Sequence, residues 1–320
     1  MQRRTFIHLT GLAMGSPFLY GTAMAKSSYP EKPIRIIVPT SPGGATDAVA
    51  RLFAEQVGSK LRNPIVIENI PGAATLLGVR QAASAKPDGY TLSIMANSFT
   101  AIPQVDKNAG YKTSDFRGVS YLARSKMFLL VSAQSPFHQL DDLIAAARKA
   151  PTALTYATVG MGTSSHVPIE MLSQAAKIEL SPIPYKGITT AIPDVIAGRV
   201  DMMMGTGAST NELIKNGKLR ALAVVDTERL PFLPDIPTFA ELGFKDVQYE
   251  LYLGLLAPAQ TPEPIVKILS QAFESVKANE AIVQRLALLD QELPSMNSAE
   301  QFNQFLQQDE QKMQQLLADI

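Results

Sequence analysis

The stretch PIRIIVPTSPGGATD, residues 33–47, decides the fold class of this chain. Its first half is a continuous apolar run rich in β-branched residues, which is typical of a strand buried on both faces of a sheet. Its second half is a loop rich in proline and glycine, and a helical period of apolar residues follows it from Thr46 to Val57. A buried strand, a glycine loop and a helix in this order predict the beginning of an α/β sheet.

The same order of strand and helix recurs along the chain in two series. Further strands are predicted at residues 65–67 and 90–95 in the first series and at 128–131, 154–158, 180–183, 200–204 and 221–225 in the second. Helices are predicted between them, for example at residues 140–149 and from residue 167 onwards. This alternation predicts a parallel, doubly wound sheet in each of two similar lobes.

The last part of the chain departs from this alternation. Residues 251–257 form a late apolar strand, and only helices are predicted after Pro262. We expect this late strand and the helices after it to pack against the first lobe. We therefore predict a discontinuous lobe 1 from residues 26–124 and 250–320, a lobe 2 from residues 125–249, and a ligand cleft between them.

The N-terminal residues have the order of a signal peptide. Arg3 and Arg4 precede a mostly apolar stretch at residues 6–20, and Ala-Met-Ala follows at residues 23–25. The apolar stretch is too short and too interrupted to span a bilayer, although a short N-terminal helix is an alternative. Removal of residues 1–25 on export predicts a periplasmic protein. The arginine pair also resembles a twin-arginine signal, and the choice between the two export routes stays open.

Composition and charge exclude several classes of function. The chain has 320 residues, of which 46% are hydrophobic and 18% are charged, so it is neither disordered nor membrane-spanning. Its 29 basic and 29 acidic side chains leave no excess charge for a phosphate backbone, so no nucleic-acid partner is expected. The absence of cysteine removes thiol nucleophiles, disulfides and zinc–cysteine sites. We predict no cofactor and no metal.

Motifs for catalysis are also missing from the sequence. No phosphate loop, complete dinucleotide fingerprint or nucleophile elbow is present. His166 follows two serines, but neighbouring side chains on a helix point about 100° apart, so Ser165 and His166 do not form a nucleophile–base pair by themselves. We therefore predict a binding protein with no catalytic residue.

Glycine loops after predicted strands carry the candidate binding chemistry. In residues 39–47, glycine lets backbone N–H groups approach a ligand, and the first turn of the following helix adds its unpaired donors and its dipole. Asp47 has two open roles, as a helix cap or as a ligand contact. Arg51 lies several positions past the loop, and a solvated or packing side chain is expected there. Residues 158–166 offer a second such loop, in which glycines precede the hydroxyl side chains of Thr163, Ser164 and Ser165, and residues 205–209 offer a third.

The predicted ligand-binding residues follow from these loops and from the end of the strand at 90–95. They are Ser41, Gly43, Gly44, Ala45, Thr46, Asp47, Asn97, Ser98, Thr158, Gly162, Thr163, Ser164, Gly205 and Thr206. The alternative is that the two principal loops are only tight turns. Two glycine loops at corresponding places in two lobes favour a ligand that is held at both ends.

Short motifs in fixed order also carry a family resemblance. They lie at residues 30–34, 38–47, 50–51, 68–73, 87–92, 160–166, 184–187, 217–223, 234–238, 241–243 and 257–262. Over essentially the whole mature length the chain resembles the TctC or Bug family, the extracytoplasmic solute receptors of tripartite tricarboxylate transporters. The resemblance implies a type II periplasmic-binding fold that closes on a carboxylate. Backbone groups and ordered water from the first glycine loop would hold one end of it.

The resemblance further implies partners, and two departures limit it. It implies a monomer that binds a small organic carboxylate and works with membrane subunits of the TctA and TctB type.

Where the family often has two glycines the chain has Ala74 and Thr75, and where it often has Phe-Asp the chain has Met204 and Gly205. The acid therefore stays open among di- or tricarboxylates, amino acids and aromatic acids. A sensor for a membrane kinase and a periplasmic enzyme acting on a carboxylate are the alternatives.

Overall fold

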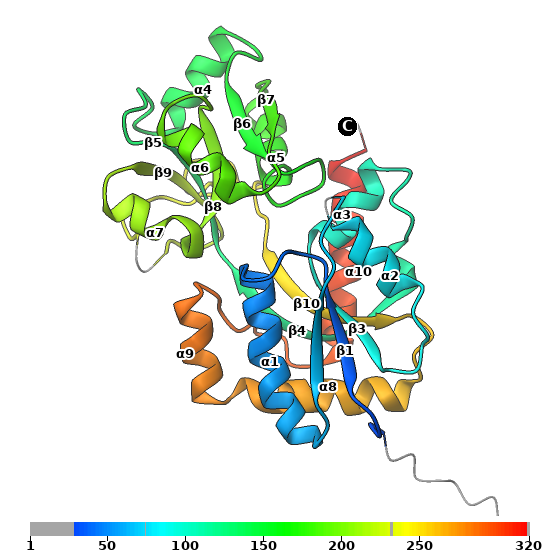
Figure 1. Ribbon diagram of the computed structural model, residues 1–320. Coiled ribbons are helices and arrows are strands. Elements are labelled where there is room, and N and C mark those ends of the chain that lie inside the picture. The colour runs from blue at the N-terminus through cyan, green and yellow to red at the C-terminus, as the bar shows by residue number, and fades with distance from the viewer. Residues whose placement is uncertain (1–28, 74, 231–232, 319–320) are drawn as a thin grey trace, which may run out of the picture.

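The structure is a computed structural model that describes residues 29–73, 75–230 and 233–318. The predicted signal peptide, residues 1–25, lies outside the described residues. Figure 1 shows two lobes joined by strands that run from one to the other. Each lobe contains a five-stranded sheet with helices packed against it.

The first lobe contains both ends of the described chain. Its strands are β1 (Ile34–Val38), β2 (Ile65–Asn69), β3 (Thr91–Ala96), β4 (Phe116–Ser125) and β10 (Leu251–Pro258). Its helices are α1 (Ala45–Leu61), α2 (Leu76–Ala83), α3 (Ser98–Val105), the short 3₁₀ helix η1 (Thr113–Asp115), α8 (Glu263–Lys277), α9 (Glu280–Leu288) and α10 (Ala299–Leu316). The strand order is β2-β1-β3-β10-β4, so β10 is inserted between two earlier strands.

The second lobe is built from one continuous part of the chain. Its strands are β5 (Met127–Ser132), β6 (Thr155–Thr158), β7 (Ser181–Pro184), β8 (Met202–Thr206) and β9 (Leu219–Val225), in the order β7-β6-β8-β5-β9. Its helices are α4 (Leu140–Lys149), α5 (Val167–Ala176), α6 (Ile188–Ile196) and α7 (Gly207–Lys215). Apolar side chains of α4 and α5 pack with β5 and β8 in one core cluster.

Both sheets are mixed, so the prediction of parallel sheets was wrong for one strand in each. β10 runs antiparallel to β3 and β4, and β5 runs antiparallel to β8 and β9. Only Lys126 separates β4 from β5, so the chain passes straight from one sheet into the other without a crossover helix. The periodicity of a sequence indicates that a strand is buried, but it carries no signal for the direction in which the strand is inserted.

The two lobes also touch away from the crossing strands. Ala101 of α3 and Met313 of α10 belong to the same buried apolar cluster as the core of the second lobe. The side-chain amide of Gln174 in α5 donates to the carbonyl of Leu316 in α10 at 3.1 Å. Among the helices of the described residues, none is long and apolar enough to cross a membrane.

Candidate functional site

All of the predicted ligand-binding residues lie near the carboxyl ends of β1, β3, β6 and β8, in the last residues of these strands, in the loops after them or in the first turn of the next helix. In open α/β sheets, ligands bind outside these strand ends. Figure 1 shows the loop after β1 on the side of the first lobe that faces the second lobe. A Cβ added to Gly162 in the loop after β6 would lie 3.1 Å from the backbone of Ile102 in α3, so two of these regions meet across the lobes.

The loop after β1 presents backbone donors to solvent. Gly43 has a left-handed φ of 83°, which turns the chain into α1, and Gly44 is the N-cap with no side-chain cap hydrogen bond. Ser41, Gly43, Gly44 and Ala45 are exposed, and Thr46 is half-buried. The N–H groups of Gly44, Ala45 and Thr46 form no hydrogen bond with any residue that the structure describes. This is the arrangement that binds anions at a helix N-terminus.

Asp47 fixes this loop to its surroundings. Its buried carboxylate accepts from the N–H of Gly43 at 3.0 Å, from Nε of Arg51 at 3.0 Å and from Nδ2 of Asn69 at 2.9 Å. Burial pushes the pKa of this carboxyl upward, but the three hydrogen bonds outweigh it and the net pKa lies below its ordinary value. The carboxylate is therefore occupied by protein donors in this structure, and it anchors the loop from the first turn of α1.

Arg51 has a more definite role than the solvated or packing side chain expected from the sequence. Its side chain is half exposed, yet its Nε pairs with Asp47 and its Nη2 donates to Oδ1 of Asn69 at 3.0 Å. Arg51 therefore belongs to the scaffold behind the loop. The spacing of four residues between Asp47 and Arg51 is a helical contact spacing and is the signal that could have revealed the pair.

Hydroxyl groups in the loop after β6 divide into two kinds. The hydroxyl of Thr163 donates to the carbonyl of Gly160 at 2.6 Å and lies 2.9 Å from Oγ of Ser165. The hydroxyl of Thr158 accepts from the N–H of Gly160 at 3.1 Å. Both threonines are buried, and their hydrogen bonds hold the loop in shape. Ser164 is half-buried and forms no hydrogen bond with the described residues, so its hydroxyl is the available one.

We expect Ser164→Ala and Thr163→Val to act through different mechanisms. Loss of the Ser164 hydroxyl should weaken binding of an acid by about 0.5–3 kcal/mol with little change in stability, because no protein partner is lost. Thr163→Val removes the hydroxyl that donates to the carbonyl of Gly160 at 2.6 Å and lies 2.9 Å from Oγ of Ser165, so the melting temperature should fall as well. Calorimetry and thermal unfolding of the two variants separate these effects. A Ser164→Ala protein with unchanged affinity would remove Ser164 from the site.

His166 is a buried structural residue in this structure. Its Nδ1 accepts from the N–H of Gly162 at 3.3 Å, and its Nε2 lies 3.8 Å from Oε1 of Glu170. Burial lowers the pKa of the imidazole, and Glu170 opposes this only in part. The same carboxylate oxygen accepts from the hydroxyl of Tyr156 at 2.9 Å. The imidazole nitrogen Nδ1 therefore accepts a hydrogen bond that holds the loop after β6 in shape.

The ends of β3 and β8 supply the other predicted residues. Asn97 is buried; its Nδ2 donates to the carbonyl of Glu250 at 2.8 Å, while its Oδ1 has no partner among the described residues. Ser98 is half-buried at the start of α3. A Cβ on Gly205 would lie 2.5 Å from Cδ1 of Leu130, so a side chain at this position would have to displace the end of the Leu130 side chain. Thr206 is the N-cap of α7, and its Oγ1 lies 3.4 Å from Oγ of Ser209.

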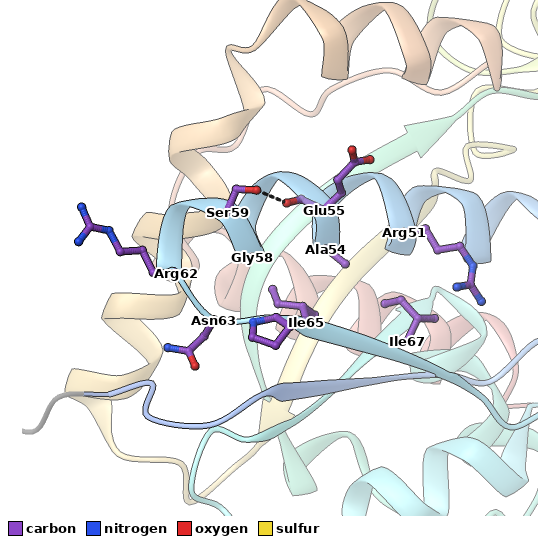
Figure 2. Close-up of a pocket in the computed structure, with 10 residues that line it drawn as sticks. Arg51, Ala54, Glu55, Gly58, Ser59, Arg62, Asn63, Ile65 and Ile67 are labelled. Atoms are coloured by element: carbon purple, nitrogen blue, oxygen red, sulfur yellow. Dashed lines mark hydrogen bonds between the residues drawn. The ribbon is translucent and has the colours of Figure 1, made fainter.

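A depression of about 550 Å³ lies on lobe 1, between the α1 helix and β2. It is lined by Arg51, Ala54, Glu55, Gly58, Ser59, Arg62, Asn63, Pro64, Ile65 and Ile67. None of the predicted ligand-binding residues lines it. Figure 2 shows the charged ends of Arg51 and Arg62 pointing away from each other, so polar groups do not converge on one point. We do not place the functional site there.

A second cavity, of about 300 Å³, lies where the chain crosses between the lobes. Its charged lining residues are Arg124, Lys126, Lys312, Asp226, Glu250 and Asp309. Burial raises the pKa of Asp309 to about 6, while Thr100 and Lys312 act in the opposite direction. Balanced charges of both signs give this cavity no preference for an anion. Within the described ranges, no group of three or more acidic or histidine side chains is placed to hold a metal ion.

Comparison with known proteins settles the family. The sequence profile of TctC, the tripartite tricarboxylate transporter family receptor, matches residues 49–320. The chain belongs to the TctC family. A relative in Agrobacterium vitis, described as a UPF0065 protein in the TAR-I ttuE-ttuC' intergenic region, is 33% identical over 268 residues, which cover 83% of this chain and 78% of the relative.

Solved structures of TctC-like receptors share the fold. The periplasmic binding protein BugD is 32% identical with a TM-score of 0.80, and the match covers 91% of this chain and 98% of BugD. MatC from Rhodopseudomonas palustris, solved with bound malate, is 28% identical with a TM-score of 0.81, and the match covers 90% of this chain and 100% of MatC. The predicted family and the two-lobed periplasmic-binding fold are thereby confirmed.

Proposed function

We propose that this TctC-family receptor works in the periplasm and captures a small organic carboxylate. The observation that carries the proposal is the first turn of α1, where Gly44 and Ala45 are exposed, Thr46 is half-buried, and the N–H groups of all three are unpaired among the described residues. The Asp47 carboxylate holds the loop that presents them. A negative ligand group is what such donors and the helix dipole stabilise. The malate in MatC is an acid of this class.

The rest of the ligand would contact the second lobe. Ser164, after β6, offers a hydroxyl without a protein partner in the described chain, and Thr206 lies at the N-terminus of α7. On the first lobe, Asn97 adds a buried carbonyl oxygen at the end of β3 that lacks a partner among the described residues. An acid held at α1 and carrying hydroxyl or amino groups toward these residues would join the two lobes. Domain closure on such a ligand follows from contacts that only the closed state provides.

We further propose that the bound acid is released unchanged to membrane subunits of the TctA and TctB type, and that the receptor acts as a monomer exported by its signal peptide. Support comes from the family, whose members are receptors of tripartite transporters. The two groups nearest to a catalytic pair, Ser165 and His166, both hydrogen-bond within their own loop. A receptor needs affinity and release, and neither requires a nucleophile.

A screen of organic acids on ligand-free protein tests the proposal. Ligand carried over from expression is removed by unfolding and refolding, and the melting temperature is then measured with each acid. We expect at least one small carboxylate to raise it, since a ligand that binds only the native state stabilises that state. The amide of the best acid is the matched control, because it keeps the shape and loses the charge. Equal stabilisation by the amide, or recovery of a chemically altered acid, would refute the proposal.

A further inference from the structure

Asp290 has a backbone conformation that favours glycine. It follows α9 with a φ of 50°, and the N–H of Gln291 donates to the carbonyl of Leu286 at 2.9 Å to close the helix. Glycine takes this conformation at helix ends without strain, and aspartate is one of the few other residues that adopt it, because its short side chain can form hydrogen bonds nearby. A residue other than glycine in this conformation points to a use for its side chain.

The side chain of Asp290 reaches from the first lobe to the second. Its Oδ2 accepts from Nδ2 of Asn211 in α7 at 3.0 Å. A Cβ on Gly207, the first residue of α7, would lie 2.5 Å from the same oxygen, so the carboxylate rests against this helix N-terminus. The dipole of α7 favours a negative charge there. In Figure 1 the upper end of α9 lies below α7, on the opposite side of the molecule from α10.

The segment after Asp290 is fixed to the strands that cross between the lobes. The backbones of Glu292 and Arg124 form a hydrogen-bonded pair in both directions, at 2.9 Å and 2.8 Å. The side chain of Gln291 donates to the hydroxyl of Ser125. Asp290 therefore has little freedom to follow α7 when the lobes rotate against each other. Rotation must lengthen or shorten its contact with Asn211.

We propose that Asp290 is a positioning residue that latches α9 of the first lobe to α7 of the second and holds the lobes in the arrangement seen here. Removing the latch shifts the population of lobe arrangements, because it removes an interaction that one arrangement has and others lack. On the proposed function, the same contact governs how readily the lobes close around an acid. The latch itself exists without ligand, so it can be tested independently of that function.

The absence of cysteine makes a distance measurement direct. Lys60→Cys in α1 and Lys149→Cys in α4 place nitroxide labels on exposed positions of the two lobes. Pulsed electron paramagnetic resonance on ligand-free protein then gives the distribution of interlobe distances. In Asp290→Ala and in Asn211→Ala, we expect the fraction of molecules at the parent's interlobe distance to fall by about half or more. The double variant should show the same fall as each single variant, because both substitutions remove the same contact. Glu280→Ala, at the exposed other end of α9, is the matched control.

Asp290→Gly separates the latch from a purely local role. Glycine suits a φ of 50°, so this variant should unfold at the same temperature as the parent or higher. It nevertheless lacks the carboxylate and should give the shifted distance distribution. Asp290→Asn keeps an oxygen for Asn211 and should restore much of the parent distribution. Parent-like distributions in both Asp290→Gly and Asp290→Ala would overturn the proposal.

Discussion

Gly44→Val is expected to weaken binding of the acid by about tenfold to a hundredfold, which corresponds to about 1.4–2.8 kcal/mol, while the fold stays intact. A Cβ at this position would meet only the carbonyl oxygen of Ser41, at 3.8 Å. The backbone at Gly44 is extended, with a φ of −79° and a ψ of 171°, so valine adopts it without strain. The added side chain would occupy the space in front of the free N–H groups, which a bound carboxylate has to enter.

Calorimetry with the acid selected by the screen measures this loss, and the melting temperature checks the fold. Gly44→Ala is the graded control, since its single methyl group fills less of the same space and should cost less affinity. Gly43 is unsuitable because its φ of 83° would add backbone strain to any substitution. A Gly44→Val protein that binds the acid as the parent does would place the carboxylate elsewhere.

Asp47→Asn is expected to cost about 2–4 kcal/mol of stability at pH 7 and to abolish most of the binding. An amide has only one accepting oxygen, whereas the buried carboxylate of Asp47 accepts from Gly43, Arg51 and Asn69. At least one of these donors would lose its partner. The loop that presents the N–H groups would then no longer be held in place.

The effect of Asp47→Asn should depend on pH in a defined direction. The pKa of Asp47 is lowered in the folded state by its hydrogen bonds, so its stabilisation is present above the unfolded pKa of about 4 and is lost as the pH falls through the folded value. The difference in stability between parent and variant should therefore shrink below about pH 4. Urea unfolding at pH 7 and pH 3 measures it, with Asp141→Asn in the first turn of α4 as control. Equal stability of parent and variant at pH 7 would contradict the anchoring role.

Much of the fold could be predicted because burial leaves a periodic mark on the sequence. The helix predicted at residues 140–149 is α4, and the apolar run before Pro39 is β1. The regions that were not predicted lack that mark. β4 is almost wholly buried but carries Arg117, Ser120 and Arg124, and α3 contains an internal proline at residue 103. Their positions are set by β10 and α10, which come much later in the chain.

The local structure of the candidate site was predictable where it depends on the backbone and not where it depends on side-chain partners. Glycines before a helix predict exposed N–H donors whatever the neighbours are. A hydroxyl group can bind its own loop or a ligand, and only the folded loop shows that Thr163 binds Gly160 while Ser164 is left available. The contact of Asp290 with Asn211 joins residues 79 positions apart, and no local pattern in the sequence reports it.

The place of β10 in the first sheet has a consequence for the order of folding. β10 lies between β3 and β4, yet the whole second lobe separates it from them in the chain. The second sheet uses only residues from Met127 to Val225, so it can be completed while the facing edges of β3 and β4 in the first sheet are still open. Such edges are sites of aberrant pairing until they are covered. The lobe whose synthesis begins first is therefore the last to be completed. Its sheet stays incomplete until the C-terminal part of the chain supplies β10.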